Sequence, residues 1–445
     1  MKKYFFFALA AAGMLSSCSS DDTVAGTEVE NDELVPIQIG FGGGSVSVDE
    51  TRGTGTVGGY QGTEENKWHS QKFNVYMLKK STMEIAKFKL TPSATGEDIY
   101  NNSQFTAPGT AFSAMGENPV GPRVSGIARP DDNKIKYYPA QDNFDFYAYR
   151  LDDAATALPV LTDDAITLDF TIDGTQDIMV AKAYPTDAEK KQLRNLYNRD
   201  IDSTRCYSSF TARHGIQPTL HFRHLLTRFT FEVVPQGNST DATSHIVIDS
   251  VKVVAKKTKG TLTVAKVGDV NGSSQVITWF DSQTDTELAL MERDSTLLKN
   301  GSVENVDSLP LVDLGTWNEQ YEISQGRPGI KGIDFSKLEV NQAYPIGDAL
   351  LLAPESEYDV KVYGHQNILD EYGLTTTRQN DFVYKATVRK NNYNDDVFKA
   401  GWSYKITISL WGINNILVNA QLSGWNEASG SYKYLPEENN GQFVE

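Results

Sequence analysis

The chain has 445 residues, and its 58 acidic side chains outnumber 41 basic ones, which gives a formal net charge of −17. This negative surface argues against binding to the phosphate backbone of nucleic acids. The length exceeds one typical hydrophobic core, so we expect two domains once any targeting segment is removed. The 21 Tyr, 20 Phe and 35 Gly residues favour strands separated by turns, and hence an all-β fold.

The first residues have the features of an export signal. A short basic start precedes an apolar run over 4–15 that is too short to span a bilayer, so residues 1–17 are predicted to be a signal peptide. The run ends in Leu15-Ser16-Ser17-Cys18, which resembles the lipobox of bacterial lipoproteins. The resemblance implies cleavage before Cys18 and acylation of its thiol. Residues 18–34 are acidic and poor in large apolar side chains, so we expect a tether.

The first patterned element after the tether is a strand with one apolar face. Apolar side chains stand at every second position, at Val35, Ile37, Ile39 and Phe41. This is the period of a strand that is covered on one side. We call residues 35–41 the leading segment. The glycine-rich stretch that follows contains Arg52 and is expected to be exposed and flexible.

The other predicted strands of the first half alternate in the same way. Each has one apolar face and one wet face, which is typical of antiparallel β-sandwiches and not of parallel α/β sheets. They are centred on residues 73–77, 144–148, 166–172, 220–224 and 229–233. One surface helix is predicted over 187–199, because Thr186 and Glu189 have the spacing of a capping box at its start.

A polar stretch after residue 235 predicts a junction between two domains. The N-terminal domain is then 35–236, and the C-terminal domain with its tail is 237–445. Clear strands of the second half are predicted at 358–362, 382–388, 402–410 and 416–422. Residues 281–345 lack steady periodicity and are expected to form long loops with a short helix at most.

Three stretches are notable for their order and spacing. They are the lipobox and tether followed by Ile37-Gln38-Ile39-Gly40-Phe41 and Thr51-Arg52; Gln176-Asp177-Ile178-Met179-Val180-Ala181 with residues 220–231; and Leu422-Ser423-Gly424-Trp425-Asn426-Glu427. Together they resemble the Bacteroidetes fimbrillin superfamily, whose members build pili from lipoprotein precursors. The resemblance implies two transthyretin-like β-sandwich domains in tandem, with minor helical insertions, at the outer surface of the outer membrane.

The resemblance also implies a mechanism of assembly. An arginine-specific protease cuts after Arg52, and the leading segment leaves its groove. A strand from the C-terminal region of a neighbouring subunit then takes its place. Tyr432 and Tyr434 continue the parity of Leu422, so residues 430–436 are a candidate donor strand. Strand exchange is also favoured on physical grounds that do not depend on the resemblance. A sandwich that lacks one strand presents unpaired backbone groups and an apolar trough, and an added strand satisfies both.

Two alternatives stay open at this point. In the first, Arg52 is an ordinary exposed residue and the leading segment stays in place, as in anchor and tip members of such families. In the second, the chain is a lipid-anchored surface glycan-binding protein, with Trp402, Trp411 and Trp425 as a sugar-stacking platform. Core packing is the competing interpretation of Trp402, which shares the apolar parity of its strand.

The sequence contains no catalytic constellation, so an enzyme is not expected, and no cofactor is expected either. His221 and His224 point to opposite faces of a strand, and we interpret His224 as a hydrogen-bonded core histidine. Paired aspartates such as Asp131-Asp132 are better explained as solvated turns than as calcium ligands. Cys206 is left without an intramolecular partner and is expected to be an inert thiol.

Overall fold

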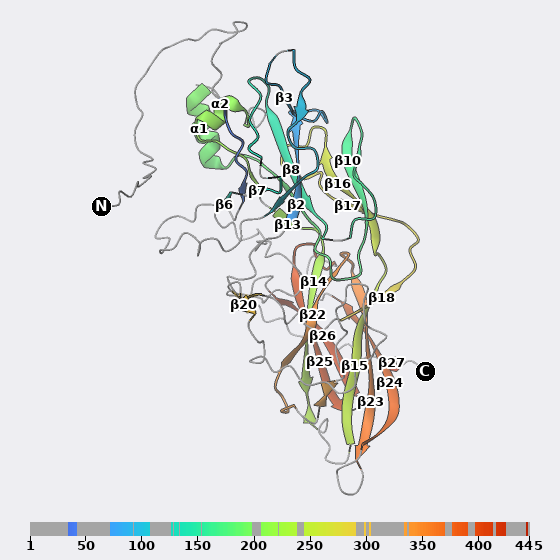
Figure 1. The fold of residues 1–445 in the computed structure, drawn as a ribbon. Coiled ribbons are helices and arrows are strands. Elements are labelled where there is room, and N and C mark those ends of the chain that lie inside the picture. Colours follow the sequence, from blue (N-terminus) through green and yellow to red (C-terminus); the bar gives the residue numbers. More distant parts are fainter. Residues whose placement is uncertain are drawn as a thin grey trace, which may run out of the picture. The chain divides into compact units, whose positions relative to one another are not determined.

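A computed structural model gives the fold of the chain (Figure 1). It describes residues 34–41, 72–91, 93–106, 126–127, 129–132, 134–152, 154–197, 206–220, 222–237, 244–290, 298–299, 302–303, 333–335, 338–369, 376–389, 397–412, 415–423 and 442–443. Most of these residues lie in antiparallel strands, and there are only two helices among them. The all-β prediction is confirmed.

The main sheet of the first half has six strands, two of which are buried on both faces. Its order is β13 (Phe222–His224), β11 (Met179–Lys182), β8 (Phe144–Arg150), β2 (Lys72–Lys79), β5 (Ser103–Thr106) and β7 (Arg129–Pro130). Every residue of β8 and of β11 is buried. Phe146 of β8 belongs to one apolar cluster, and its neighbours Tyr147 and Tyr149 belong to another. The prediction of one wet face for each strand is therefore wrong for β8, because a second layer covers that face.

There are two smaller sheets, one of which also takes strands from beyond residue 236. One has four strands in the order β17 (Ile277–Trp279), β16 (Lys259–Lys266), β10 (Ala165–Thr171) and β9 (Val160–Leu161). The other has three, in the order β12 (Thr219–Leu220), β1 (Gly40–Phe41) and β6 (Gly126–Ile127). β3 (Lys87–Phe88) and β4 (Glu97–Asp98) form a separate short pair. Apolar residues of β10 and β16 share a cluster with Tyr147 and Tyr149, so this four-stranded sheet is the covering second layer.

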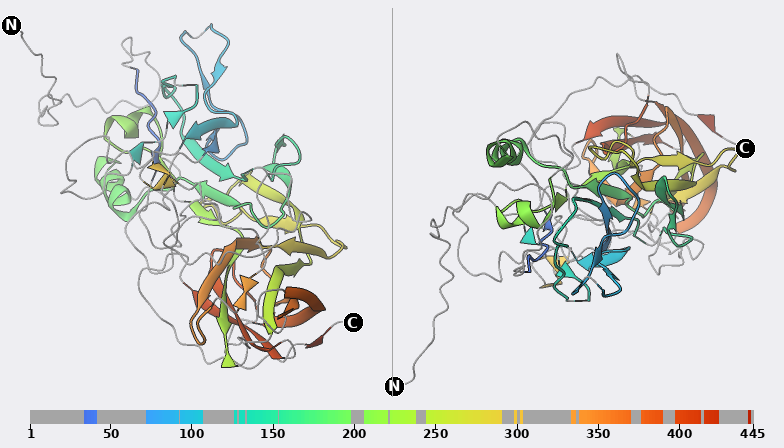
Figure 2. Two further views of the ribbon diagram at one scale, coloured as in Figure 1. Left: turned by 60° about the horizontal axis from the view of Figure 1, so that its bottom comes forward. Right: turned by 90° about the horizontal axis from the view of Figure 1, so that it is seen from above.

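Most strands of the second half form a sandwich of two sheets around one large apolar cluster (Figure 2). One sheet has the order β22 (Tyr344–Leu352), β14 (Thr227–Pro235), β25 (Ser403–Gly412) and β26 (Asn415–Ser423). The other has the order β18 (Thr286–Ala289), β15 (Ser244–Ala255), β23 (Glu357–Leu369), β24 (Thr376–Arg389) and β27 (Gln442–Phe443), with β21 (Ile333–Asp334) paired to β15. β25 and β26 form the predicted C-terminal hairpin.

Strand pairing crosses the predicted domain junction in both directions. β14 precedes the junction but pairs with β22 and, in parallel, with β25 of the second half. β16 follows the junction but pairs with β10 of the first half. Residues from Val35 onward belong to one unit. The division at residue 236 stays a prediction, and any two domains here share strands from each other's half of the sequence.

The helices are short and lie between strands of the first half. α1 (Asp187–Tyr197) confirms the predicted helix, and its capping box is present, with Thr186 N donating to Glu189 Oε2 at 2.7 Å. α2 (Ser209–Arg213) was not predicted. Within the described residues, no helix has the length and apolar character needed to span a membrane. In the region without periodicity, the described elements are short strands, including β19 (Leu298–Lys299) and β20 (Ser302–Val303).

Candidate functional site

The leading segment buries every second side chain, as its pattern predicts. Val35 and Ile37 are each 8% exposed and Ile39 is 1% exposed, whereas Pro36 and Gln38 face solvent. The side chain of Phe41 lies outside the described residues. The alternation is thus observed for three of the four positions, and their role as an acceptor groove stays a prediction.

Backbone hydrogen bonds hold one side of the leading segment. The amide of Ile37 donates to the carbonyl of Lys136 at 2.9 Å, and the amide of Tyr138 donates to the carbonyl of Val35 at 2.9 Å. Further along, β1 pairs antiparallel with β6. This side of the segment therefore makes an ordinary antiparallel ladder with residues that lie about a hundred positions later in the chain.

The opposite side of the leading segment faces residues 217–220. The amide of Gly40 donates to the carbonyl of Pro218 at 2.8 Å, and β1 pairs in parallel with β12. Ahead of this pair, a side chain replaces the strand partner. Gln217 Oε1 accepts a hydrogen bond from the amide of Gln38 at 3.2 Å, and Gln217 Nε2 donates to the carbonyl of Pro36 at 3.1 Å. Gly40 and Phe41 at the end of the leading segment therefore form the middle strand of their sheet (β1; the leading segment is dark blue in Figure 1).

The sequence analysis missed Gln217. It stands alone between a short helix and a short strand, and no motif marks it. Only the fold brings it to Gln38, which is 179 positions away in the sequence. A polar residue that acts through contact with a distant backbone leaves no periodic signal, so nothing in the sequence points to it.

The buried side chains of the leading segment pack on one face of the six-stranded sheet. They share one apolar cluster with β2, β8 and β11 and with Leu193 of α1. The large members of this cluster include Phe73, Phe105, Phe144 and Phe146. Apolar side chains at alternate positions are what a trough of this kind selects, because each one that leaves water stabilises the docked strand.

Residues 217–220, which flank the leading segment, are followed in the chain by β13. β13 pairs with β11 so that His224 lies opposite Met179. Beside this pair, His224 Nδ1 donates to Asp177 Oδ1 at 2.8 Å, and both side chains are fully buried. The interpretation of His224 as a hydrogen-bonded core histidine is confirmed. The two parts of the second sequence stretch, some forty residues apart, are thus neighbouring strands beside the groove.

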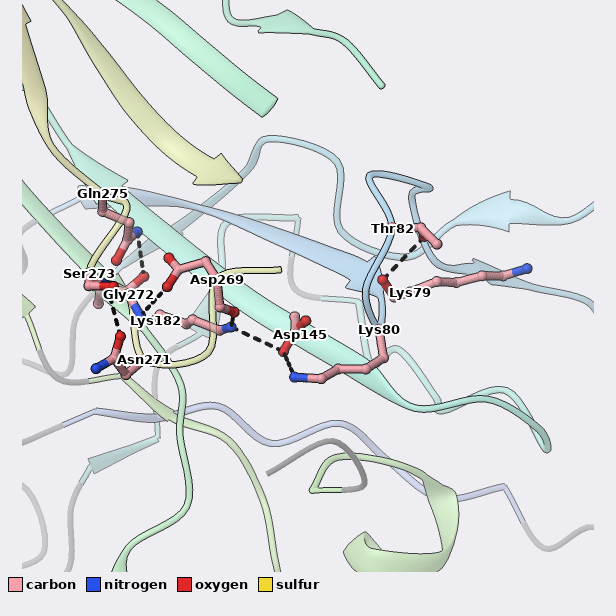
Figure 3. A network of polar contacts seen from close by, with 11 residues as sticks. Lys79, Lys80, Thr82, Asp145, Lys182, Asp269, Asn271, Gly272, Ser273 and Gln275 are labelled. Atoms are coloured by element: carbon pink, nitrogen blue, oxygen red, sulfur yellow. Dashed lines mark hydrogen bonds and ion pairs between the residues drawn. The ribbon is translucent and has the colours of Figure 1, made fainter. Parts of the chain in front are cut away.

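A buried charged network lies at the end of the same sheet (Figure 3). Asp145 Oδ1 is 2.8 Å from Lys80 Nζ and 3.4 Å from Lys182 Nζ, so one carboxylate faces two ammonium groups. Lys182 also donates to the backbone carbonyl of Asp269. Burial lowers the pKa of Lys182, although the nearby carboxylate of Asp145 opposes this effect. All the named partners lie within the fold, and we assign the network a structural role.

Several predicted site residues lie outside the described part of the chain. They are the lipidation site Cys18, the processing site Arg52, the candidate donor residues Tyr432 and Tyr434, Trp425 of the sugar-stacking platform, and His221. Their proposed roles stay predictions. Cys206, by contrast, is described, and it is buried among apolar side chains of the cluster that contains the leading segment.

Metal-binding geometry is not found among the described residues. No three or more His, Cys, Asp or Glu side chains in that part of the chain are grouped so that they could hold an ion. Asp131 instead pairs with Lys72 at 3.0 Å and accepts a hydrogen bond from Thr106 Oγ1 at 2.6 Å. This carboxylate thus cross-links neighbouring strands.

The expected position of Trp402 is wrong. Its side chain is 39% exposed, and Lys399 Nζ lies 5.6 Å from the centre of its ring. The residue stands directly before β25. Trp411 is 37% exposed, but it lies near the other end of β25. Strand residues advance by about 3.3 Å each, so these two rings are too far apart to stack on one sugar.

Known proteins resemble this chain in structure, whereas the sequence comparisons give no match. No protein-family model matches the chain, and no curated protein matches it significantly. Solved structures do resemble it. A fimbrial protein from Bacteroides vulgatus is 14% identical, with 88% of this chain and 99% of that chain covered and a TM-score of 0.44. The fimbrial anchor protein Mfa2 from Porphyromonas gingivalis is 9% identical, with 88% and 97% covered and a TM-score of 0.27.

Proposed function

We propose that this chain is a structural subunit of a cell-surface pilus that supports adhesion. It is exported as a lipoprotein precursor acylated at Cys18 and held at the outer membrane. An arginine-specific protease cuts after Arg52 and frees the leading segment. A strand from the C-terminal region of another subunit, with Tyr432 and Tyr434 as candidate contact residues, then fills the groove.

The observation that carries this proposal is that hydrogen bonds hold the backbone of the leading segment on both sides. Its departure would leave the carbonyls of Lys136 and Pro218 and the amide of Tyr138 without their strand partner. It would also uncover the apolar trough that now holds Val35, Ile37 and Ile39. An extended strand from a neighbour satisfies both needs at once, and this links one molecule to the next.

Mass spectrometry of the surface form tests the maturation step. We expect a new N-terminus at Gly53, together with ladders of polymers on SDS gels run without boiling. Arg52→Ala should abolish both. Arg194→Ala is the matched control, because Arg194 is an exposed residue on α1 and should leave processing unchanged.

A different result would contradict the proposal. A mature protein that keeps acylated Cys18 joined to the rest of the chain, and that runs as a monomer, excludes assembly by release of the leading segment. A lipid-anchored binding protein would then be the better description, and glycan arrays would be the next measurement.

A further inference from the structure

We propose that Gln217 recognises the backbone of the strand that occupies the groove, and that Thr219 sets the register of the leading segment by crowding any side chain at the position of Gly40. The second occupant, a strand from another copy of this chain, rests on the proposed function. The recognition of the leading segment itself does not.

Gln217 makes the two contacts that a strand partner would make. Its Oε1 accepts from the amide of Gln38 at 3.2 Å, and its Nε2 donates to the carbonyl of Pro36 at 3.1 Å. Both groups on the leading segment are backbone atoms. The contact therefore depends on an extended backbone and not on the side chains of the bound strand.

Tyr138 sets the orientation of this amide. Its hydroxyl donates to Gln217 Oε1 at 3.3 Å, and its ring is 3% exposed. Because the hydroxyl proton is directed at the oxygen, the nitrogen of the amide is left to face Pro36. The same Tyr138 donates its backbone amide to the carbonyl of Val35. The hydrogen bond from Tyr138 thus orders the side chain of Gln217 before a strand enters, so less conformational entropy is lost when the strand binds.

A side chain at Gly40 would require Thr219 to move. A Cβ atom there would lie 2.6 Å from Oγ1 of Thr219, while the next nearest atoms are Thr219 Cβ at 3.4 Å and the carbonyl oxygen of Pro218 at 3.5 Å. A single atom, the hydroxyl oxygen of Thr219, accounts for the clash. A strand that enters one residue out of register would place a larger residue against it.

Together these contacts explain how the leading segment fits its groove. It carries apolar side chains at Val35, Ile37 and Ile39, and glycine directly after the third. It also needs a free amide at the position of Gln38, so a proline there is excluded. Proline is tolerated at position 36, where the strand offers only its carbonyl to Gln217.

Amide hydrogen exchange on the full, uncut chain tests the role of Gln217. We expect Gln217→Ala to raise the exchange rate of the Gln38 amide at least tenfold and to leave that of Ala148 in β8 unchanged. Gln192→Ala is the matched control, since Gln192 Nε2 also donates to a backbone carbonyl, that of His214 at 2.7 Å, and not to one of the leading segment.

An exchange rate for Gln38 within twofold of the wild type in Gln217→Ala would overturn the proposal. If Gln217→Ala also raises the exchange rate of the Ala148 amide, Gln217→Met is the deciding variant. It keeps the length of the side chain and deletes both polar atoms, and the same two amides are compared.

A double substitution tests the register contact. We expect Gly40→Ala to raise the exchange rate of residues 35–41 at least tenfold. Adding Thr219→Ala removes the clashing oxygen and should return the rate to within threefold of Thr219→Ala alone. If Gly40→Ala has no effect, or if Thr219→Ala does not relieve it, the register role of Thr219 is wrong.

A polymerisation assay separates this inference from the proposed function. Wild type and Gln217→Ala are treated with an arginine-specific protease, and their ladders on SDS gels are compared. Absence of ladders from both proteins refutes polymerisation and leaves the exchange result standing. Equal ladders from both proteins support polymerisation but refute recognition of the incoming strand by Gln217. A loss of at least tenfold in the polymers of Gln217→Ala alone supports both.

Discussion

Asp177 Oδ1 lies 2.8 Å from His224 Nδ1, and neither side chain is exposed to solvent. The pair joins the turn before β11 to β13. β13 follows residues 217–220, which flank the leading segment. A second pair of the same chemistry, Asp249 Oδ2 and His365 Nδ1, is 2.9 Å apart, but 16% of the Asp249 side chain is exposed. The two pairs differ mainly in burial, so they form a natural comparison.

Asp177→Ala should lower the free energy of unfolding by about 1–3 kcal/mol, because it leaves a buried ring nitrogen without its hydrogen-bond partner. Asp249→Ala should cost about 1 kcal/mol, since water can replace the lost contact near the surface. Urea unfolding of both variants measures the difference. Equal losses would show that burial does not set the value of these pairs.

Ile39→Ala should weaken the docking of the leading segment by about 2–5 kcal/mol, because it removes apolar atoms from a site that is 1% exposed. Gln38→Ala should change docking by less than about 0.5 kcal/mol, because its side chain faces solvent and its backbone contacts are kept. Amide exchange of residues 35–41 reports the free energy of this local opening. Similar losses for both variants would contradict the assigned faces.

Stability should fall above pH 10, because burial raises the pKa of several tyrosines. For Tyr149, burial raises the pKa to about 12, although a hydrogen bond to Asn102 works against the rise. The unfolded chain then loses the tyrosine proton first, so stability declines between about pH 10 and pH 12. Tyr149→Phe should flatten this decline by at most about 3 kcal/mol. Tyr137→Phe is the control, since that ring is only half-buried, and an unchanged decline in Tyr149→Phe would refute the assignment.

Glu287 should contribute stability that is lost in acid. Burial alone would raise the pKa of Glu287, but hydrogen bonds from Lys252 at 2.8 Å and Lys361 at 2.6 Å outweigh burial and lower it to about 2. The contribution is present above about pH 4.5 and disappears as the pH falls towards 2. Glu287→Gln should therefore cost up to about 1 kcal/mol at pH 7 and little at pH 2, because the group is one-third exposed. A cost that does not depend on pH would contradict this.

The sequence by itself determined the features that depend on neighbouring residues. Period-two patterns located the leading segment, β10, β14 and the β25–β26 hairpin, since alternate side chains of a strand point to opposite faces. The capping box located α1, because its contacts join residues only three positions apart. The parity of His224 placed it in the core for the same local reason.

The tertiary structure decided whatever depends on the partner of a strand. Alternation in β8 is the same whether the second face meets water or another sheet, and only the layer of β10 and β16 shows that it is buried. The parallel pairing of β14 with β25 and the reach of Gln217 to Gln38 join residues more than a hundred positions apart. Such contacts depend on how distant parts of the chain come together in the fold, and a local sequence pattern does not specify this.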